Sequence, residues 1–173
     1  DKDNVKSVIS VLRRPNSYYF NAISDYYFES QTKEIKTQGY TNGSMSRVTQ
    51  YNGNGRPELE AILAANKIYV WGTGSASFYS GNAGDFTGDD LASIPSYEEI
   101  LNIEQQHIDL GEYVTYNDMN CIHVRVVNKE NTADEYYISI DSGLLISMKS
   151  YENNDIVYEL KIDYLDPQQV SDD

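Results

Sequence analysis

The sequence has 173 residues, enough for one domain with a sizeable core, and its 27 acidic and 13 basic side chains give a formal charge of −14. Binding to nucleic acid or to an anionic membrane surface requires clustered lysine and arginine, so this charge argues against both partners and is typical of a soluble surface. The single cysteine cannot form an intrachain disulfide, and no apolar run approaches the roughly 18 residues that span a bilayer.

A short amphipathic helix is predicted near the start of the chain, from about residue 4 to residue 13. Its apolar residues recur at positions i, i+3, i+4 and i+7: Val5, Val8, Ile9 and Leu12. Either Asp3 or Asn4 can cap its start, and Pro15 opposes its continuation. The chain begins at Asp1 without an initiator methionine, which fits a processed exported protein and equally a trimmed chain.

Strands are predicted next, at residues 17–29, 31–40 and 44–51, where tyrosines and β-branched residues suit a half-buried pleated surface. Asn42-Gly43 is a two-residue hairpin signal between the last two of them. Residues 57–66 are ambiguous, because Leu59, Ile62 and Leu63 fit helical spacing whereas Leu59, Ala61 and Leu63 alternate. We predict a strand there because the segment lies between two strand-like runs.

A strand at 67–72 is predicted to pair back with 76–80 across Gly72-Thr73-Gly74-Ser75, and residues 81–92 are predicted to form a loop. A second short helix follows, with Tyr97, Ile100 and Leu101 on its apolar side. Either Ser93 or Ser96 caps it, and Ser96 would place Glu99 at the third helical position of a capping box.

The end of the chain has the strongest pattern. A hairpin is predicted for 112–116 and 119–127 about Asn117-Asp118, and strands at 136–140 and 144–149 are joined by Asp141-Ser142-Gly143. In the last strand, alternate residues face one way: Ile156, Tyr158, Leu160, Ile162 and Tyr164. This predicts an antiparallel meander, followed by a frayed tail at 166–173.

Residues that could support catalysis or bind a metal are few. Cys121 and His123 share one face of a predicted strand, but catalytic Cys and His partners are normally distant in sequence, so a packed cysteine beside a partly exposed ring is the better interpretation. Three acids crowd the 81–92 loop without the spacing of a calcium loop, and we interpret them as solvated: Asp85, Asp89 and Asp90. We therefore predict a non-enzymatic protein with no metal and no cofactor.

An aromatic cluster falls on the two strands around residue 74: Tyr69, Trp71, Phe78 and Tyr79. Aromatic residues on neighbouring strands can line an apolar cleft or stack on sugars. They can also be ordinary core, and the sequence leaves these alternatives open.

Taken in order, these segments resemble the LolA-like lipoprotein-carrier superfamily, including its lipid-binding lipoproteins and its anti-sigma-factor regulators. The resemblance is carried by an opening helix and long first strand, by KIYVWGTGSASFYSG, by the short helix in IPSYEEIL, and by the pairing of EYVTYNDMNCIHVRV with EYYISIDSGLLISMKSYENNDIVYELKIDYL. It implies an α+β, mostly antiparallel fold in one domain over 1–165, with a strongly curved half-barrel sheet and short helices packed on its concave side. It also implies an extracytoplasmic protein, secreted or anchored through an N-terminal lipid, and no catalytic residues.

The resulting hypothesis is a monomeric binding protein that holds a lipid or other hydrophobic ligand between sheet and helices. The expected lining comprises Val8, Ile9, Leu12, Tyr69, Trp71, Ile138, Ile146, Tyr158, Leu160 and Ile162. Two alternatives remain: a protein-interaction or sensor domain with a self-filled half-barrel and an envelope protein as partner, and a carbohydrate-binding module. A pocket of roughly 300 Å³ or more favours the first hypothesis over a self-filled interior, and coplanar exposed rings favour the third.

Overall fold

The computed structural model describes residues 1–128 and 131–165, so the tail predicted to be frayed lies outside the described residues. The strands are β1 (Ser17–Phe28), β2 (Gln31–Asn42), β3 (Met45–Tyr51), β4 (Pro57–Ala64), β5 (Lys67–Gly72), β6 (Tyr79–Asn82), β7 (Ile108–Tyr116), β8 (Met119–Val127), β9 (Thr132–Ser139), β10 (Leu145–Glu152) and β11 (Asp155–Leu165). The helices are α1 (Val5–Val11), α2 (Gly88–Leu91) and the 3₁₀ helices η1 (Lys2–Asn4), η2 (Tyr97–Asn102) and η3 (Gln105–His107).

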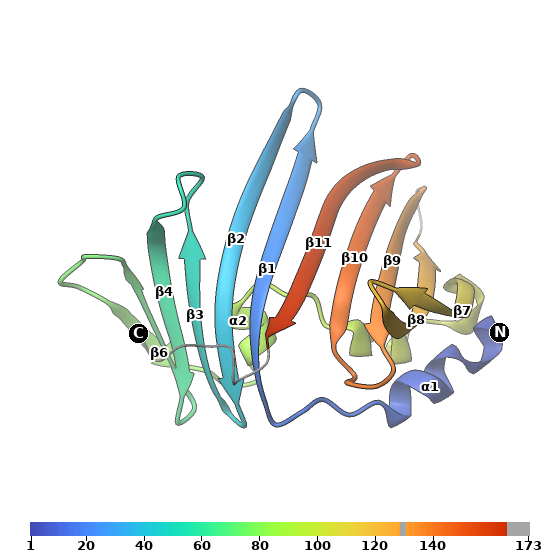
Figure 1. Cartoon of the computed structure of the whole chain (residues 1–173), viewed down its shortest axis with the longest axis horizontal. Helices are drawn as coiled ribbons and strands as arrows, with labels where there is room; N and C mark the ends of the chain where they lie inside the picture. Colours follow the sequence, from blue (N-terminus) through green and yellow to red (C-terminus); the bar gives the residue numbers. More distant parts are fainter. Residues whose placement is uncertain (129–130, 166–173) are drawn as a thin grey trace. The chain divides into compact units, whose positions relative to one another are not determined.

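The strands follow one another in the order β6-β5-β4-β3-β2-β1-β11-β10-β9-β8-β7, so the sheet is open, with β6 and β7 at its ends (Figure 1). The prediction of a mostly antiparallel sheet with a few short helices is confirmed. No helix among the described residues is long and apolar enough to cross a membrane.

The described chain falls into two compact units. Unit 1 contains residues 1–15, 24–33 and 96–162, and unit 2 contains 16–23, 34–95 and 163–165. Both α1 and the meander β7–β10 belong to unit 1, whereas β3–β6 and α2 belong to unit 2.

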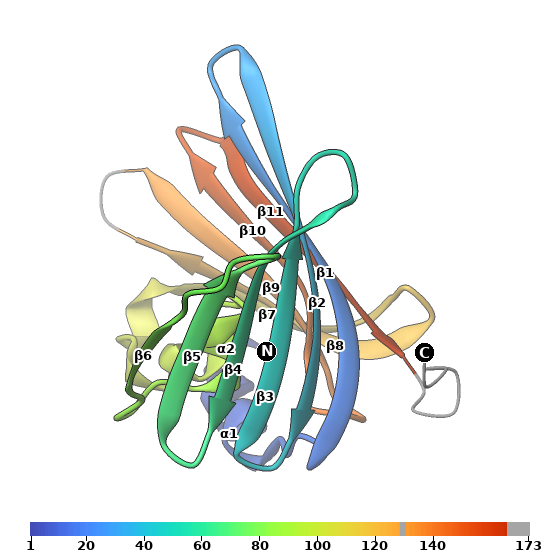
Figure 2. The same cartoon turned by 90° about the vertical axis from the view of Figure 1, so that its left-hand side faces the viewer.

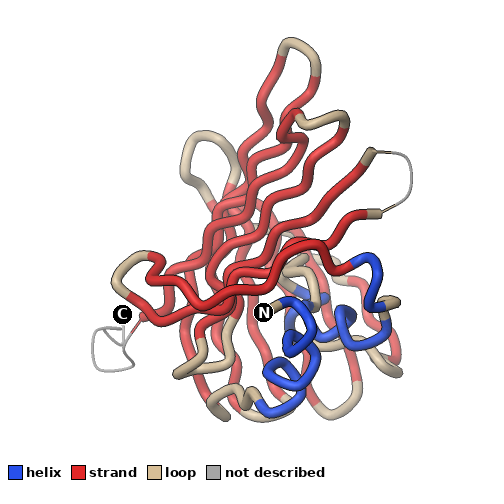
Figure 3. Tube along the Cα trace, turned by 90° about the vertical axis from the view of Figure 1, so that its right-hand side faces the viewer, coloured by secondary structure: helices blue, strands red, loops and turns tan. Residues whose placement is uncertain are grey.

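The core of unit 1 lies on one face of its meander. Leu160 pairs with Met148, Met148 with Tyr136, and Tyr136 with Val124, which places four buried side chains in one row across the strands. The helices of this unit lie together beside these strands (Figure 3). Val5 of α1 packs so closely on β7 that a Cβ added at Gly111 would lie 2.2 Å from its Cγ2.

Tight turns join the strands of the meander as the sequence predicts. Asn117 and Asp118 have φ values of 49° and 60°, the left-handed pair that a two-residue hairpin turn requires. Gly143, at φ 65°, provides the turn between β9 and β10. The β2–β3 hairpin also forms, but Asn42 pairs with Met45, so its central residues are Gly43 and Ser44 rather than Asn42 and Gly43.

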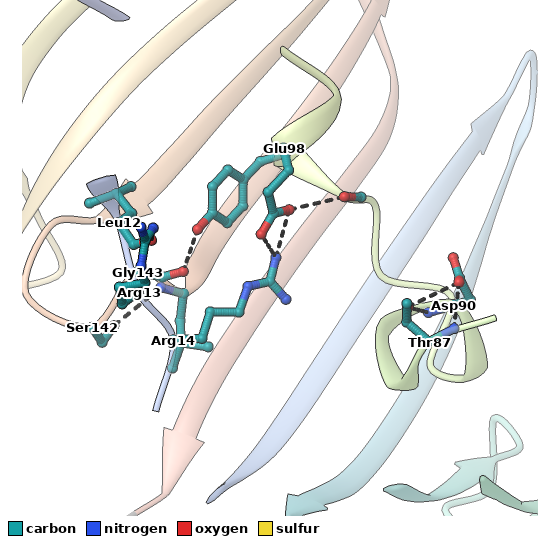
Figure 4. A network of polar contacts seen from close by, with 11 residues as sticks. Leu12, Arg13, Arg14, Thr87, Asp90, Glu98, Ser142 and Gly143 are labelled. Atoms are coloured by element: carbon teal, nitrogen blue, oxygen red, sulfur yellow. Dashed lines mark hydrogen bonds and ion pairs between the residues drawn. The ribbon is translucent and has the colours of Figure 1, made fainter. Parts of the chain in front are cut away.

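A polar network fixes the segment after α1 to the rest of unit 1 (Figure 4). The Arg14 Nη2 donates to both carboxylate oxygens of Glu98, at 2.6 and 2.8 Å, and its guanidinium lies 5.0 Å from the centre of the Tyr97 ring. The Tyr97 hydroxyl, itself buried, donates to the carbonyl of Gly143 at 2.6 Å. The segment, η2 and the β9–β10 turn are thereby joined.

In unit 2 the ambiguous segment 57–66 is β4, as predicted, while two other predictions are wrong. The pairing strand expected at 76–80 is β6, which begins only at Tyr79, because Ser75 and Ser77 hydrogen bond to each other within the loop. The loop expected at 81–92 contains α2, which packs against β3 and β4 (Figure 2).

The capping box also belongs to α2 and not to the helix after Ser96. Thr87 Oγ1 accepts from the Asp90 backbone N–H, and the Asp90 carboxylate accepts from the Thr87 backbone N–H at 2.8 Å. Ser96 does occupy the N-cap position of η2, but its hydroxyl donates to Glu98 and does not accept from the helix. Asp90 therefore has a local structural role.

Candidate functional site

Strand β4 has one face covered by α2, and the paired strands β4 and β5 share an open face on the other side. Ala61 and Leu63 are buried on the covered face, where α2 packs against this strand. Because side chains alternate along a strand, Ile62 lies on the other face, and Tyr69 pairs with it across β5. Trp71, two residues further on, shares this open face.

The open face contains a pocket of about 250 Å³. Its walls are Ile62, Tyr69 and Trp71 from the strands, and Ser75, Ala76, Ser77 and Phe78 from the loop between β5 and β6. The loop is held in place because Thr73 N–H donates to the Glu58 carbonyl at 3.0 Å and Ser75 N–H donates to the Gly72 carbonyl at 2.9 Å.

Three aromatic rings line the pocket, those of Tyr69, Trp71 and Phe78. The Tyr69 and Phe78 rings lie 6.2 Å apart at an interplanar angle of 51°, so they form a tilted wall and not the flat platform that sugar stacking would use. Phe78 is 65% exposed, although it is a large apolar side chain. The residues that form these walls carry no carboxylate, imidazole or cationic group, so the pocket offers apolar contact and hydroxyl groups.

The other expected lining residues belong to unit 1, and most are packed core. Ile138, Ile146, Leu160 and Ile162 are at most 2% exposed. Ile9 of α1 is also buried, whereas Val8 and Leu12 are half-buried. The space that Val5 and Val8 enclose with β7 and β8 is about 40 Å³, room for about one water molecule. This part of unit 1 is filled by its own side chains.

Tyr158 completes the expected set and is half-buried in unit 1, with its ring centre 5.0 Å from that of Tyr26. Burial raises the pKa of its phenol, and a hydrogen bond with Ser24 partly offsets this. Of the ten expected lining residues, the structure thus brings Tyr69 and Trp71 together at a pocket. That any of the ten binds a ligand stays a prediction.

Two other cavities in unit 1 are more polar. One, of about 320 Å³, lies between Arg125, Tyr151 and the turns at residues 131 and 153–154; Arg125 is already paired with Asp109 at 3.2 Å. The other, of about 390 Å³, lies at the end of the β7–β8 hairpin and includes Asp141. Neither has an apolar lining comparable to that of the pocket in unit 2.

Cys121 and His123 lie on one face of β8, as expected, in a structural setting. The His123 ring stacks on Tyr137 with centres 4.4 Å apart, and its Nδ1 lies 3.2 Å from a Glu112 oxygen. Burial, together with Asp141, raises the pKa of the Cys121 thiol, which disfavours the nucleophilic thiolate. The described residues include no group of His, Cys, Asp or Glu side chains placed to hold a metal ion.

The sequence identified Tyr69 and Trp71 as lining residues and missed Ile62. The signal for Ile62 was present: a two-residue turn at Ala65-Asn66 sets a register in which Ile62 faces Tyr69 across the hairpin. Phe78 was recognised as part of the aromatic cluster, but without the β6 boundary its contact with Tyr69 could not be assigned.

An open, mostly antiparallel sheet with few short helices places the protein in the class of folds that the resemblance to LolA-like proteins implied. No protein-family model and no curated protein matches the sequence. Among solved structures, an uncharacterised conserved protein from Thermus thermophilus is similar at a TM-score of 0.54 and 10% identity, over 99% of this chain and 92% of that one.

MucB in complex with MucA(peri) is similar at a TM-score of 0.51 and 10% identity, over 96% of this chain and 56% of that one. A LolA superfamily protein from Nitrosomonas europaea gives 0.41 and 8%, over 95% and 91%. At such identities the likeness is one of fold.

Proposed function

We propose that this chain is a non-enzymatic binding domain of the cell envelope, whose ligand places one hydrophobic group in the pocket formed by Ile62, Tyr69, Trp71 and Phe78. The observation that carries the proposal is the pocket itself, an apolar and open cavity with three aromatic walls on the uncovered face of β4 and β5. The envelope location rests on the resemblance in the sequence.

The binding energy would come from burial of apolar surface. Each methylene removed from water contributes about 0.8 kcal/mol, so a group of four carbons contributes about 3 kcal/mol before any ordering cost. Phe78 adds its own area, because 65% of its surface is exposed and becomes available for contact. The proposal therefore needs no charged or catalytic group in the lining.

The size of the cavity favours a protein side chain as the group that is bound. Small-molecule sites usually enclose about 300–1,000 Å³, and this pocket, at about 250 Å³, is smaller and open. MucB, a structure of similar fold, holds MucA(peri) as its partner. Both observations support the protein-interaction alternative over the enclosure of a whole lipid.

Trp71 provides a direct test, because it is the only tryptophan in the chain and it lines the pocket. Its emission spectrum is recorded while lauric acid, lysophosphatidylcholine or butylbenzene is added below any micelle-forming concentration. We expect a saturable change in the emission of Trp71.

A matched pair of variants makes the test specific. Phe78→Ser removes an aromatic wall and should weaken binding about tenfold, the effect of losing an important contact residue. Phe28→Ser changes a phenylalanine of similar exposure, 63% against 65%, that is not among the residues lining the pocket, and should leave binding unchanged. If none of the three probes gives a saturable response, or if both variants behave alike, the pocket is not the binding site.

A further inference from the structure

We propose that the partner presents an extended, basic peptide segment, which adds as a strand to the edge of β6 and inserts one bulky apolar side chain into the aromatic pocket. This inference rests on the proposed function, because it uses the same pocket. It adds the class of the ligand, its conformation and the spacing of its side chains.

The edge of β6 is open to strand addition. β6 lies at one end of the strand order, and no strand of residues 1–128 or 131–165 pairs with its outer edge. An exposed edge usually carries lysine, proline or inward-pointing charges that prevent pairing with another chain. β6 is short, with only the four residues Tyr-Ser-Gly-Asn, but it carries no lysine, proline or charge, whereas β7, at the other end of the order, includes Asp109 and Glu112.

The pocket lies within reach of a strand added at this edge. Ser80 of β6 pairs with Tyr69, so Ser80 is on the face that carries the pocket. Its side chain is small, and a leucine or phenylalanine placed opposite it can extend across it toward Tyr69 and Phe78. The added strand and β5 are two strand spacings apart, about 10 Å, so the apolar side chain and the Tyr69 ring meet by leaning toward each other over Ser80.

The net charge of the chain favours a basic segment, because a charge of −14 attracts a cationic partner from a distance. On the open face itself, Glu60 pairs with Trp71 and is offset by Arg47, 3.8 Å away, and Lys67 shares this face because it alternates with Tyr69. The attraction therefore comes from the chain as a whole and not from the pocket face.

Because side chains alternate along a strand, the pocket and Trp71 together predict a sequence pattern for the added segment. Residues two apart in the added segment share a face, so a lysine or arginine two positions from the apolar anchor lies toward Trp71 of β5. There it can reach the indole ring for a cation–π interaction. The segment therefore reads apolar-x-basic along the face that meets the pocket.

The test uses a labelled ten-residue peptide, capped at both ends, in which threonine alternates with lysine and one central leucine replaces a lysine. Fluorescence anisotropy against the intact chain should give a saturable curve in the micromolar range. Amide hydrogen exchange should slow at residues 79–82 when the peptide is present. Replacing the leucine by serine should weaken binding about tenfold.

Two further peptides test the contributions of the backbone hydrogen bonds and of the positive charge, and they require no protein variant. Methylation of three consecutive central backbone nitrogens removes the hydrogen bonds of an added strand and should abolish binding. Replacing all lysines by glutamates should also abolish it. On the protein, Ser80→Lys should weaken the peptide at least about tenfold by placing a charge on the edge, whereas Ser30→Lys makes the same charge change in the exposed β1–β2 turn and should not.

The results separate this inference from the function on which it rests. If the small apolar probes bind in a manner that depends on Phe78 but the leucine peptide does not bind, or binds without protecting residues 79–82, the peptide inference is overturned and the hydrophobic site stands. Binding of lysophosphatidylcholine that the peptide cannot displace also overturns it, in favour of a lipid. If neither probes nor peptide bind, both proposals fail.

Discussion

Gly143→Ala tests the packing of the N-terminal segment on the β9–β10 turn of unit 1. Gly143 has a φ of 65°, and a Cβ built there would lie 2.7 Å from the carbonyl oxygen and 2.8 Å from the carbonyl carbon of Arg13. Both contacts are with backbone, so no side chain can rotate to relieve them. The left-handed conformation costs an alanine about 1–2 kcal/mol.

Displacement of the turn adds a second cost, because the carbonyl of Gly143 accepts the buried hydrogen bond from Tyr97. A buried donor that loses its partner costs about 1–3 kcal/mol. We therefore expect Gly143→Ala to lower the free energy of unfolding by about 2–5 kcal/mol, measured by urea denaturation followed by far-ultraviolet circular dichroism.

Gly74→Ala is the matched control. Gly74 also has a positive φ, at 80°, but no heavy atom lies within 4 Å of a Cβ built at that position. It should show only the conformational cost, about 1–2 kcal/mol. Equal losses in the two variants would refute the reasoning, since the contact with Arg13 would then contribute nothing.

Two further predictions concern a buried phenol and a helix cap. Burial raises the pKa of Tyr136, and Asp134 and Glu99 act in the same direction; the folded state therefore keeps its proton above pH 10, near the ordinary value for tyrosine, while the unfolded state loses it. The stabilisation that is present below about pH 10 is therefore lost as the pH rises. In Tyr136→Phe, the midpoint of urea denaturation should fall less steeply between about pH 8 and pH 11 than it does in the unmodified protein. Thr87→Ala should lower the free energy of unfolding by about 1 kcal/mol. Ser96→Ala should lower it less, because the Ser96 side chain does not cap η2. If urea denaturation showed the larger loss for Ser96→Ala, the capping box predicted at Ser96 from the sequence would be supported after all.

The terminal meander could be predicted because local pattern and tertiary burial agree there. Leu160 and Ile162 alternate with charged residues, and the structure buries both while exposing Lys161 between them. The turns between these strands also follow from local chemistry, since Asn153 and Asn154 adopt the left-handed conformations that asparagine tolerates. In such a segment each residue responds mainly to its neighbours in sequence.

The helices were harder to predict because short helices depend on tertiary contacts. α2 has four residues, including Gly88 and two aspartates, a composition with low helix propensity. Gly88 packs on β3 so closely that an added Cβ would lie 2.2 Å from the Ser46 hydroxyl. The capping box at Thr87 and this close approach specify the helix, and only the second involves a residue distant in sequence.

The candidate site was predicted only in part because strand alternation does not show which face a helix will cover. Tyr69 and Trp71 were expected to lie between sheet and helices. In unit 2 they lie instead on the open face of the β4–β5 pair, the face away from the buried Ala61 and Leu63. Had the position of α2 been known, the alternation of β4 and β5 would have assigned both aromatic residues to the open face.

This arrangement separates binding from stability. A strand face in water needs only polar side chains, and β3 provides them with Arg47 and Thr49 on the same face. Trp71 and Phe78 on that face do not enter the buried core of unit 2, and Phe78 buries only about a third of its surface on folding. Its replacement by serine should therefore change the unfolding midpoint little while it weakens ligand binding about tenfold. A large loss of stability in Phe78→Ser would instead mean that the aromatic rings pack mainly for the fold, and the case for a binding site would lose its foundation.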